Sequence, residues 1–193
     1  MLPRLAVFLA LVACALPAGP RAALAQSPGG PGSVRPGTVS ALVVPVSGMT
    51  CALCTRGVET SIRLLDVVGG ASADLSTGLV RVQAAEGKSL NIRDVKDRVQ
   101  AAGFKVGGEC EVEAVGRFSI GQEGKITFRV PGTAYAYQVL EDGELRRLFK
   151  SHAGLKGDYF LVFRLHEHPR WKPPAIAIVR AEYRGEASQA PVR

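Results

Sequence analysis

The sequence predicts an α+β protein in which an antiparallel sheet, covered on one face by two helices, is followed by a small β-rich barrel. Two observations carry this prediction. Between residues 39 and 115, the patterns follow the order strand, helix, strand, strand, helix, strand. Between residues 116 and 186, short strand-like runs and glycine-rich turns surround one helical stripe. The chain has 193 residues, which is enough for two small domains of this kind.

Residues 1–25 have the composition of a secretory signal. Arg4 precedes an apolar run of about 15 residues, and the small-residue motif Ala23-Leu24-Ala25 follows it. The run is too short and too broken to span a bilayer comfortably. We therefore expect cleavage after Ala25 and a periplasmic or secreted mature protein. The alternative is a bacterial lipoprotein, in which Cys14 would carry the lipid.

Charge and cysteine count narrow the classes of function. Removing residues 1–25 takes away two arginines and no acidic residue, so the formal net charge falls from +7 to +5. The basic residues are scattered, which is typical of a solvated surface, and nucleic acid is a poor partner for an exported chain. The positive charge mildly favours acidic protein partners. Three cysteines remain, and an odd number argues against a disulfide framework.

The first strand and helix follow a flexible segment. Residues 26–38 are rich in Pro and Gly, which predicts a linker. Residues 38–46, "TVSALVVPV", form a β-branched run that predicts a strand. After it, apolar residues recur at spacings of four, four and three, which predicts a helix that Gly69-Gly70 ends. These apolar residues are Cys54, Val58, Ile62 and Leu65.

The rest of the first part predicts a hairpin, a second helix and a last strand. Residues 71–75 and 79–84 are strand-like and flank a Ser-Thr-Gly turn. Asn91 is a candidate N-cap for a helix that ends at Gly103. Strand character returns in residues 104–115. The whole order is that of a ferredoxin-like βαββαβ sandwich.

The second part, residues 116–186, predicts an OB-like barrel. Three strand candidates are followed by a helix with Leu145, Leu148 and Phe149 on one side, and then by two further strands. We expect residues 187–193 to be a disordered tail. The strand candidates are residues 111–120, 125–130, 134–140, 158–165 and 175–183, and the helix is 144–154.

Cys51 and Cys54 form the strongest candidate site. Two thiolates suit soft ions of low coordination number: Cu(I) first, with Hg(II), Ag(I) or Cd(II) chemically acceptable as well. The two-residue spacing places both sulfurs at the start of a helix, where backbone amides favour thiolate over thiol. A structural zinc site needs four ligands, and only Cys110 and three distant histidines could complete one. The same two cysteines could instead form a redox pair or an incidental disulfide, although the context lacks the aromatic and proline residues usual in thioredoxin-like motifs.

Residues 39–115 resemble the heavy-metal-associated domain of copper chaperones, of copper-transporting P-type ATPases and of the periplasmic mercuric-ion binding protein. The resemblance covers about 75 residues. It rests on "GMTCALC" (Gly48–Cys54), "DLSTGLVRV" (Asp74–Val82) and "AAGF" (Ala101–Phe104). Stand-alone chaperones of this family lack the second domain.

The resemblance implies roles for individual residues. Cys51 and Cys54 would bind the metal, Met49 would pack inward under the loop, and Phe104 would shield the ion from a facing loop. The partner would be a metal-transporting membrane protein or another CxxC protein that takes the ion by ligand exchange. No enzymatic step is implied.

Other candidates are weaker. Cys110 lies well down the last strand, and we expect it to be buried or paired. His166 and His168 would share one face of a strand, a spacing that can hold a metal, but surface histidines are commoner and no third ligand is near in sequence. Three aromatic residues could form a base-stacking platform, although packing in the core is the better account. These are Phe128, Tyr135 and Tyr137.

The sequence has no glycine-rich phosphate loop, serine-centred elbow or paired carboxylates. We therefore expect an exported, non-enzymatic soft-metal carrier. A periplasmic thiol-disulfide oxidoreductase that uses the same two cysteines is the alternative.

Overall fold

The computed structural model describes residues 37–168 and 170–185, which belong to one compact unit. The predicted signal segment, most of the predicted linker and the predicted tail lie outside the described residues. No helix in the described part of the chain is long and apolar enough to cross a membrane.

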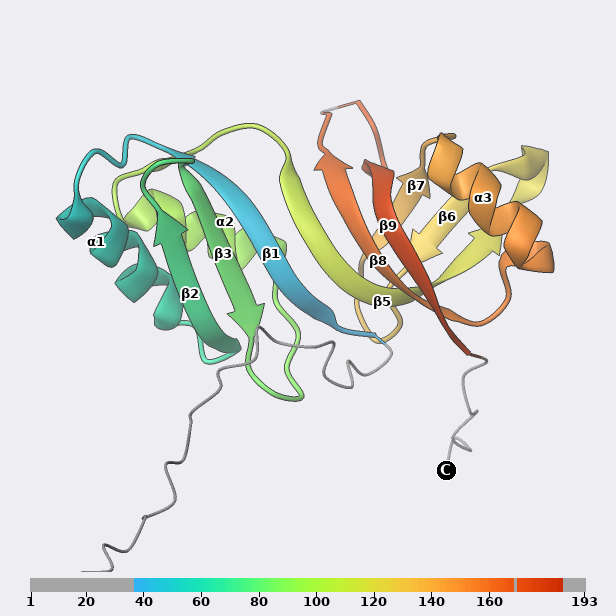
Figure 1. Cartoon of the computed structure of the whole chain (residues 1–193), viewed down its shortest axis with the longest axis horizontal. Helices are drawn as coiled ribbons and strands as arrows, with labels where there is room; N and C mark the ends of the chain where they lie inside the picture. The colour runs from blue at the N-terminus through green and yellow to red at the C-terminus, as the bar shows by residue number, and fades with distance from the viewer. Residues whose placement is uncertain (1–36, 169, 186–193) are drawn as a thin grey trace, which may run out of the picture. The chain divides into compact units, whose positions relative to one another are not determined.

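The first half of the described chain has the predicted ferredoxin-like arrangement (Figure 1). Its strands lie in the order β2-β3-β1-β5, every neighbouring pair is antiparallel, and the short β4 also pairs with β1. The two helices contact each other, and they pack on the sheet at β2 and β1 respectively. The elements are β1 (Val39–Ser47), α1 (Ala52–Arg63), β2 (Val68–Asp74), β3 (Leu79–Ala84), α2 (Ile92–Ala101), β4 (Lys105–Val106) and β5 (Cys110–Ile120).

Strand alternation and helix periodicity build one apolar core between the sheet and the helices. The predicted stripe of the first helix supplies the buried face of α1, which consists of Val58 and Ile62. Asn91 caps α2 as predicted, because its Oδ1 accepts a hydrogen bond from the Arg93 N–H at 3.0 Å. Full burial of each aliphatic side chain contributes about 1.5–3 kcal/mol. The most buried members are Leu42, Val44, Val58, Ile62, Val80, Val82, Val95, Val99 and Val112.

The prediction that Gly69-Gly70 ends the first helix is wrong. The helix α1 ends at Arg63, and both glycines lie inside β2. The pairing of β2 with β3 shifts register between Val68 and Gly70, and a Cβ on Gly69 would lie 3.0 Å from the Ala84 carbonyl oxygen. The glycines therefore allow a bulge at the start of a strand, which a local helix-breaking rule does not distinguish from a helix end.

The strand β5 belongs to both halves of the molecule. One edge of its first part pairs with β1, while the other edge pairs with β8 over residues 110–116. Residues 117–120 then pair with β6. The predicted domain boundary after residue 115 falls inside this strand, so the backbone passes from sheet to barrel without a linker.

The second half is a closed five-stranded barrel. Its strands follow the order β5-β6-β7-β9-β8, and β8 returns to β5. The pair β7–β9 is parallel and the others are antiparallel. The predicted strands and helix of this half are all confirmed. The elements are η1 (Gln122–Gly124), β6 (Ile126–Arg129), β7 (Ala136–Val139), α3 (Gly143–Ser151), η2 (Ala153–Leu155), β8 (Asp158–His166) and β9 (Ala175–Gly185).

Aromatic rings fill the barrel. Phe128 and Tyr137 are buried, each packs against Phe163, and Tyr135 stacks on Tyr137. The interpretation of these residues as packing is therefore confirmed. In α3, Leu145 and Leu148 are buried, but the predicted third member of the stripe, Phe149, is exposed.

A second contact joins the barrel to α2. The Tyr135 hydroxyl donates to Asn91 Oδ1 at 3.0 Å and accepts from the Ile92 N–H at 3.3 Å. Nearby, Lys96 of α2 forms an ion pair with Glu167. The two halves are therefore connected through α2 as well as through β5.

Candidate metal site

The candidate site is the loop between β1 and α1. Gly48 takes a φ of +98°, a value that favours glycine, and turns the chain out of β1. Met49 then enters the core, with 9% of its surface exposed, while Thr50 and Cys51 face solvent. The inward packing of Met49 is confirmed, and this buried side chain anchors an otherwise exposed loop.

Cys51 is the N-cap of α1. Its backbone is extended, with φ −151° and ψ 161°, and its Sγ accepts a hydrogen bond from the Cys54 N–H at 3.2 Å. The Cα atoms of Cys51 and Cys54 are 5.2 Å apart and their sulfurs form a disulfide. The helix start therefore brings the two sulfurs together at a place where backbone N–H groups stabilise negative charge.

Phe104 lies beside this loop, where α2 ends. Its N–H donates to the Val99 carbonyl at 3.2 Å, and its ring Cδ1 is 3.7 Å from the position that a Cβ on Gly48 would take. The ring is half-buried against the core. The structure thus places Phe104 against the loop that carries Cys51, as the resemblance implies, while its shielding of an ion stays a prediction.

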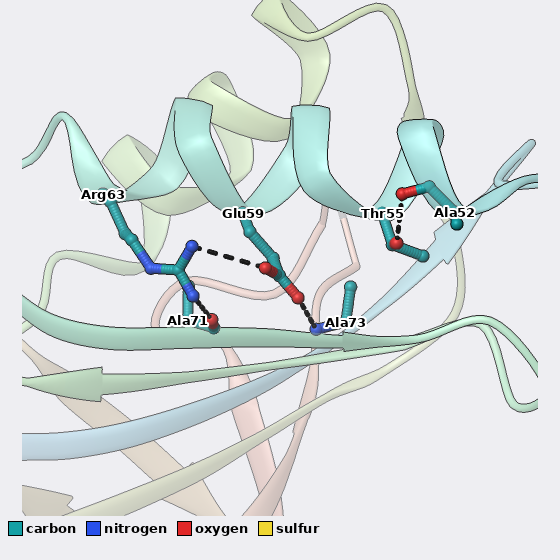
Figure 2. Close-up of polar contacts among 6 residues, drawn as sticks. All are labelled: Ala52, Thr55, Glu59, Arg63, Ala71 and Ala73. Carbon is teal, nitrogen blue, oxygen red and sulfur yellow. Dashed lines mark hydrogen bonds and ion pairs between the residues drawn. The ribbon is translucent and has the colours of Figure 1, made fainter.

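A polar column runs along α1 on the side that faces β2 (Figure 2). It consists of Thr55, Glu59 and Arg63, spaced four residues apart. Thr55 Oγ1 donates to the Ala52 carbonyl at 2.9 Å. Glu59 joins Arg63 in an ion pair of 3.3 Å, and both side chains bind the backbone of β2. We did not predict this column from the sequence, although a Glu–Arg pair four residues apart on a predicted helix was a visible signal.

One basic and one apolar side chain are exposed next to the two cysteines in the first turn of α1. The first turn of α1 contains no acidic residue, and Arg56 is exposed. Leu53, between the two cysteines, is 76% exposed. A partner that covers Cys51 therefore meets an apolar side chain and a positive charge.

Cys110 is separate from this loop. It is buried in β5 opposite Leu165 of β8 and forms no disulfide. Burial raises the pKa of its thiol, which favours the weakly ligating neutral form. In the part of the chain that the structure describes, no three His, Cys, Asp or Glu side chains are grouped so that they could hold a metal.

The prediction that His166 and His168 share a strand face is wrong, because β8 ends at His166. His166 Nδ1 lies 2.5 Å from Glu109 Oε1, whereas His168 Nδ1 accepts the Arg170 N–H at 3.2 Å. The Nδ1 atoms of the two histidines therefore contact different partners, on either side of the end of β8.

Comparison with known proteins decides the family. The heavy-metal-associated domain family matches residues 43–105. The copper chaperone CopZ of Bacillus subtilis (strain 168) is 33% identical over 61 residues, which cover 32% of this chain and 87% of CopZ. The chain belongs to the heavy-metal-associated domain family. Both cysteines of the candidate site and Phe104 lie within the matched residues.

Solved structures that are similar to this chain include heavy-metal-associated domains. A CopZ metallochaperone is 31% identical, with a TM-score of 0.33, over 35% of this chain and 100% of that one. A copper binding domain from HMA7, a P-type ATPase, is 29% identical, with a TM-score of 0.33, over 35% of this chain and 90% of that one. The family match ends at residue 105, so the barrel lies outside it.

Proposed function

We propose that this protein carries or sequesters Cu(I) through the thiolates of Cys51 and Cys54 and hands the ion to a partner. The observation that carries the proposal is the placement of both sulfurs at the exposed N-terminus of α1, in a family whose relatives include the copper chaperone CopZ. Two soft sulfur ligands suit Cu(I), and Hg(II) or Ag(I) would accept the same pair.

The handover is a ligand exchange. A thiolate of the partner attacks the bound ion, a three-coordinate intermediate forms, and one cysteine of this chain leaves. A second exchange transfers the ion completely. No atom changes oxidation state and no general acid or base is needed, so exposure of the loop is what the reaction requires.

The partner we propose is a metal-transporting membrane protein or another CxxC metal-binding protein. A copper binding domain of a P-type ATPase is among the similar structures. The exposed Arg56 and Leu53 favour a partner surface that is acidic around an apolar patch.

We also propose that the protein is exported to the periplasm, with lipid attachment at Cys14 as the alternative. For the second half of the chain we propose an OB-like barrel, a type that the strand connectivity supports.

Anaerobic titration of the reduced protein with Cu(I), against a chromogenic chelator, tests the proposal. We expect one ion per chain, and loss of binding in the Cys51→Ser/Cys54→Ser double variant. Cys110→Ser is the matched control, because it removes one thiol outside the site. Stoichiometric binding by the double variant would overturn the proposal.

A thiol-disulfide oxidoreductase is the second candidate, because the structure joins the same two cysteines in a disulfide. An insulin-reduction assay on the metal-free protein separates the two functions. Turnover that depends on Cys51 supports the enzyme, whereas inactivity together with tight Cu(I) binding supports the carrier.

A further inference from the structure

Both cysteines of the candidate site take their positions from α1. Cys51 caps the helix, because its carbonyl accepts the N–H groups of Cys54 and Thr55 and its Sγ accepts the Cys54 N–H. Cys54 lies in the first turn of the helix and moves with it. The position of the two sulfurs relative to Phe104, which follows α2, therefore depends on how α1 is seated on the sheet.

Few apolar side chains fix the roll of α1 about its own axis. The buried residues of the helix are Val58 and Ile62, and the same stripe continues at its N-terminal end only through the half-buried Cys54. Side-chain ends lie about 5 Å from a helix axis, so a roll of about 20° moves a sulfur by roughly 2 Å. Functional groups need placement to within about 0.5 Å, so a second restraint on the helix is required.

The polar column supplies that restraint on the neighbouring face of α1. Glu59 Oε1 accepts the Ala73 N–H at 2.8 Å, and Glu59 Oε2 pairs with Arg63, which donates to the Ala71 carbonyl (Figure 2). Both backbone groups belong to β2, the edge strand of the sheet. One carboxylate thus joins the helix to a fixed point of the sheet.

We propose that Glu59 is a positioning residue for the metal site. By binding Ala73 and orienting Arg63, it sets the roll of α1 and hence the position of both sulfurs relative to Phe104. This inference rests on the proposed metal-binding role of the two cysteines. Glu59 is not one of the proposed ligands, so its effect reaches the site only through the helix.

The test compares Cu(I) affinities of full-chain variants by anaerobic chelator competition. Glu59→Ala removes the acceptor for the Ala73 N–H, and we expect binding about tenfold weaker. Glu59→Gln keeps an amide oxygen at that place, and we expect an affinity within about threefold of the wild type. Amide exchange at Ala73 reports the contact directly: it should accelerate in Glu59→Ala and stay slow in Glu59→Gln.

Ser89→Ala is the matched control for loss of stability. Ser89 Oγ accepts the Val39 N–H at 2.9 Å, so the variant also deprives a strand N–H of its side-chain acceptor, at the opposite end of β1 from the metal loop. We expect its Cu(I) affinity to match that of the wild type. Wild-type affinity in Glu59→Ala, equal losses in Glu59→Ala and Glu59→Gln, or an equal loss in Ser89→Ala each overturn the inference. A wild type that binds no Cu(I) instead overturns the proposed function on which it rests.

Discussion

The Cys54 N–H donates a hydrogen bond to the sulfur of Cys51 at 3.2 Å, so the first cysteine caps the helix that carries the second. Cys51 is exposed, Cys54 is half-buried and Cys110 is buried. The three thiols of the reduced protein therefore lie in three different environments.

These environments predict an order of alkylation. With limiting iodoacetamide at neutral pH, we expect Cys51 of the reduced protein to react first and Cys54 more slowly. Cys110 should react only after unfolding, because burial raises the pKa of its thiol and blocks access. Peptide mapping by mass spectrometry measures the order. Rapid labelling of Cys110 in the native protein would contradict the structure.

Met49 is a structural anchor of the metal loop, because its side chain lies in the core. Met49→Ala should lower the free energy of unfolding by about 2–4 kcal/mol through the cavity it leaves. Met49→Leu keeps the volume and should cost less than about 1.5 kcal/mol. Both variants should bind one Cu(I) when folded, as measured by titration after denaturant unfolding has established their stability. Loss of stoichiometry in a folded Met49→Leu would show that the sulfur binds the metal.

Unfolding of a Gly116 variant tests whether the sheet and the barrel unfold together. A Cβ at this position of β5 would lie 2.4 Å from the Arg129 carbonyl oxygen and 2.7 Å from Phe128 Cζ. We expect Gly116→Ala to destabilise the protein by about 1–3 kcal/mol. Because β5 belongs to both halves, far-UV circular dichroism and Trp171 fluorescence should report one shared transition. Two separate transitions, with only the fluorescence transition shifted, would show that the barrel unfolds independently.

Gly57→Ala is a glycine substitution that we expect to stabilise the protein. A Cβ on this helical glycine meets nothing within 4 Å, so the substitution should stabilise α1 by up to about 1 kcal/mol. Denaturant unfolding of this variant beside the wild type measures the gain. A destabilised Gly57→Ala would mean that the side chain meets an obstacle at this position.

Because the Tyr137 hydroxyl is buried, we expect the folded protein to lose stability in alkaline solution. Its hydroxyl is buried without a hydrogen-bond partner among the described residues, and burial raises its pKa above the ordinary value near 10. The folded protein therefore keeps this proton when the unfolded chain begins to lose it, so stability is intact below pH 10 and falls as the pH rises further. Urea unfolding at several pH values measures the slope.

Tyr137→Phe should reduce that slope. At neutral pH the variant should be as stable as the wild type or more stable by about 1 kcal/mol, because it removes an unpaired buried hydroxyl. A substantial loss of stability in Tyr137→Phe at neutral pH would reveal a partner for the hydroxyl.

Local sequence patterns were sufficient to predict most helices and strands of this protein. The apolar spacing that begins at Cys54, the N-cap at Asn91 and the strand-like runs of the second half each depend on neighbours in sequence. Each of these elements formed, although α1 ends before the predicted glycines. Gly69-Gly70 was misread because a helix end and a β-bulge need the same permissive residue. Which of the two forms depends on the approach of Ala84 from another strand.

The sequence by itself determined the two-cysteine motif, the helix that carries it and the family to which it belongs, since these are encoded in short spacings. Only the tertiary structure decided that β5 serves both the sheet and the barrel, and that Glu59 and Arg63 hold α1 on the edge strand. These features join residues that are distant along the chain, such as Glu113 with Val162 and Glu59 with Ala73. Their pairing depends on strand register and helix roll, which are set when the whole core packs.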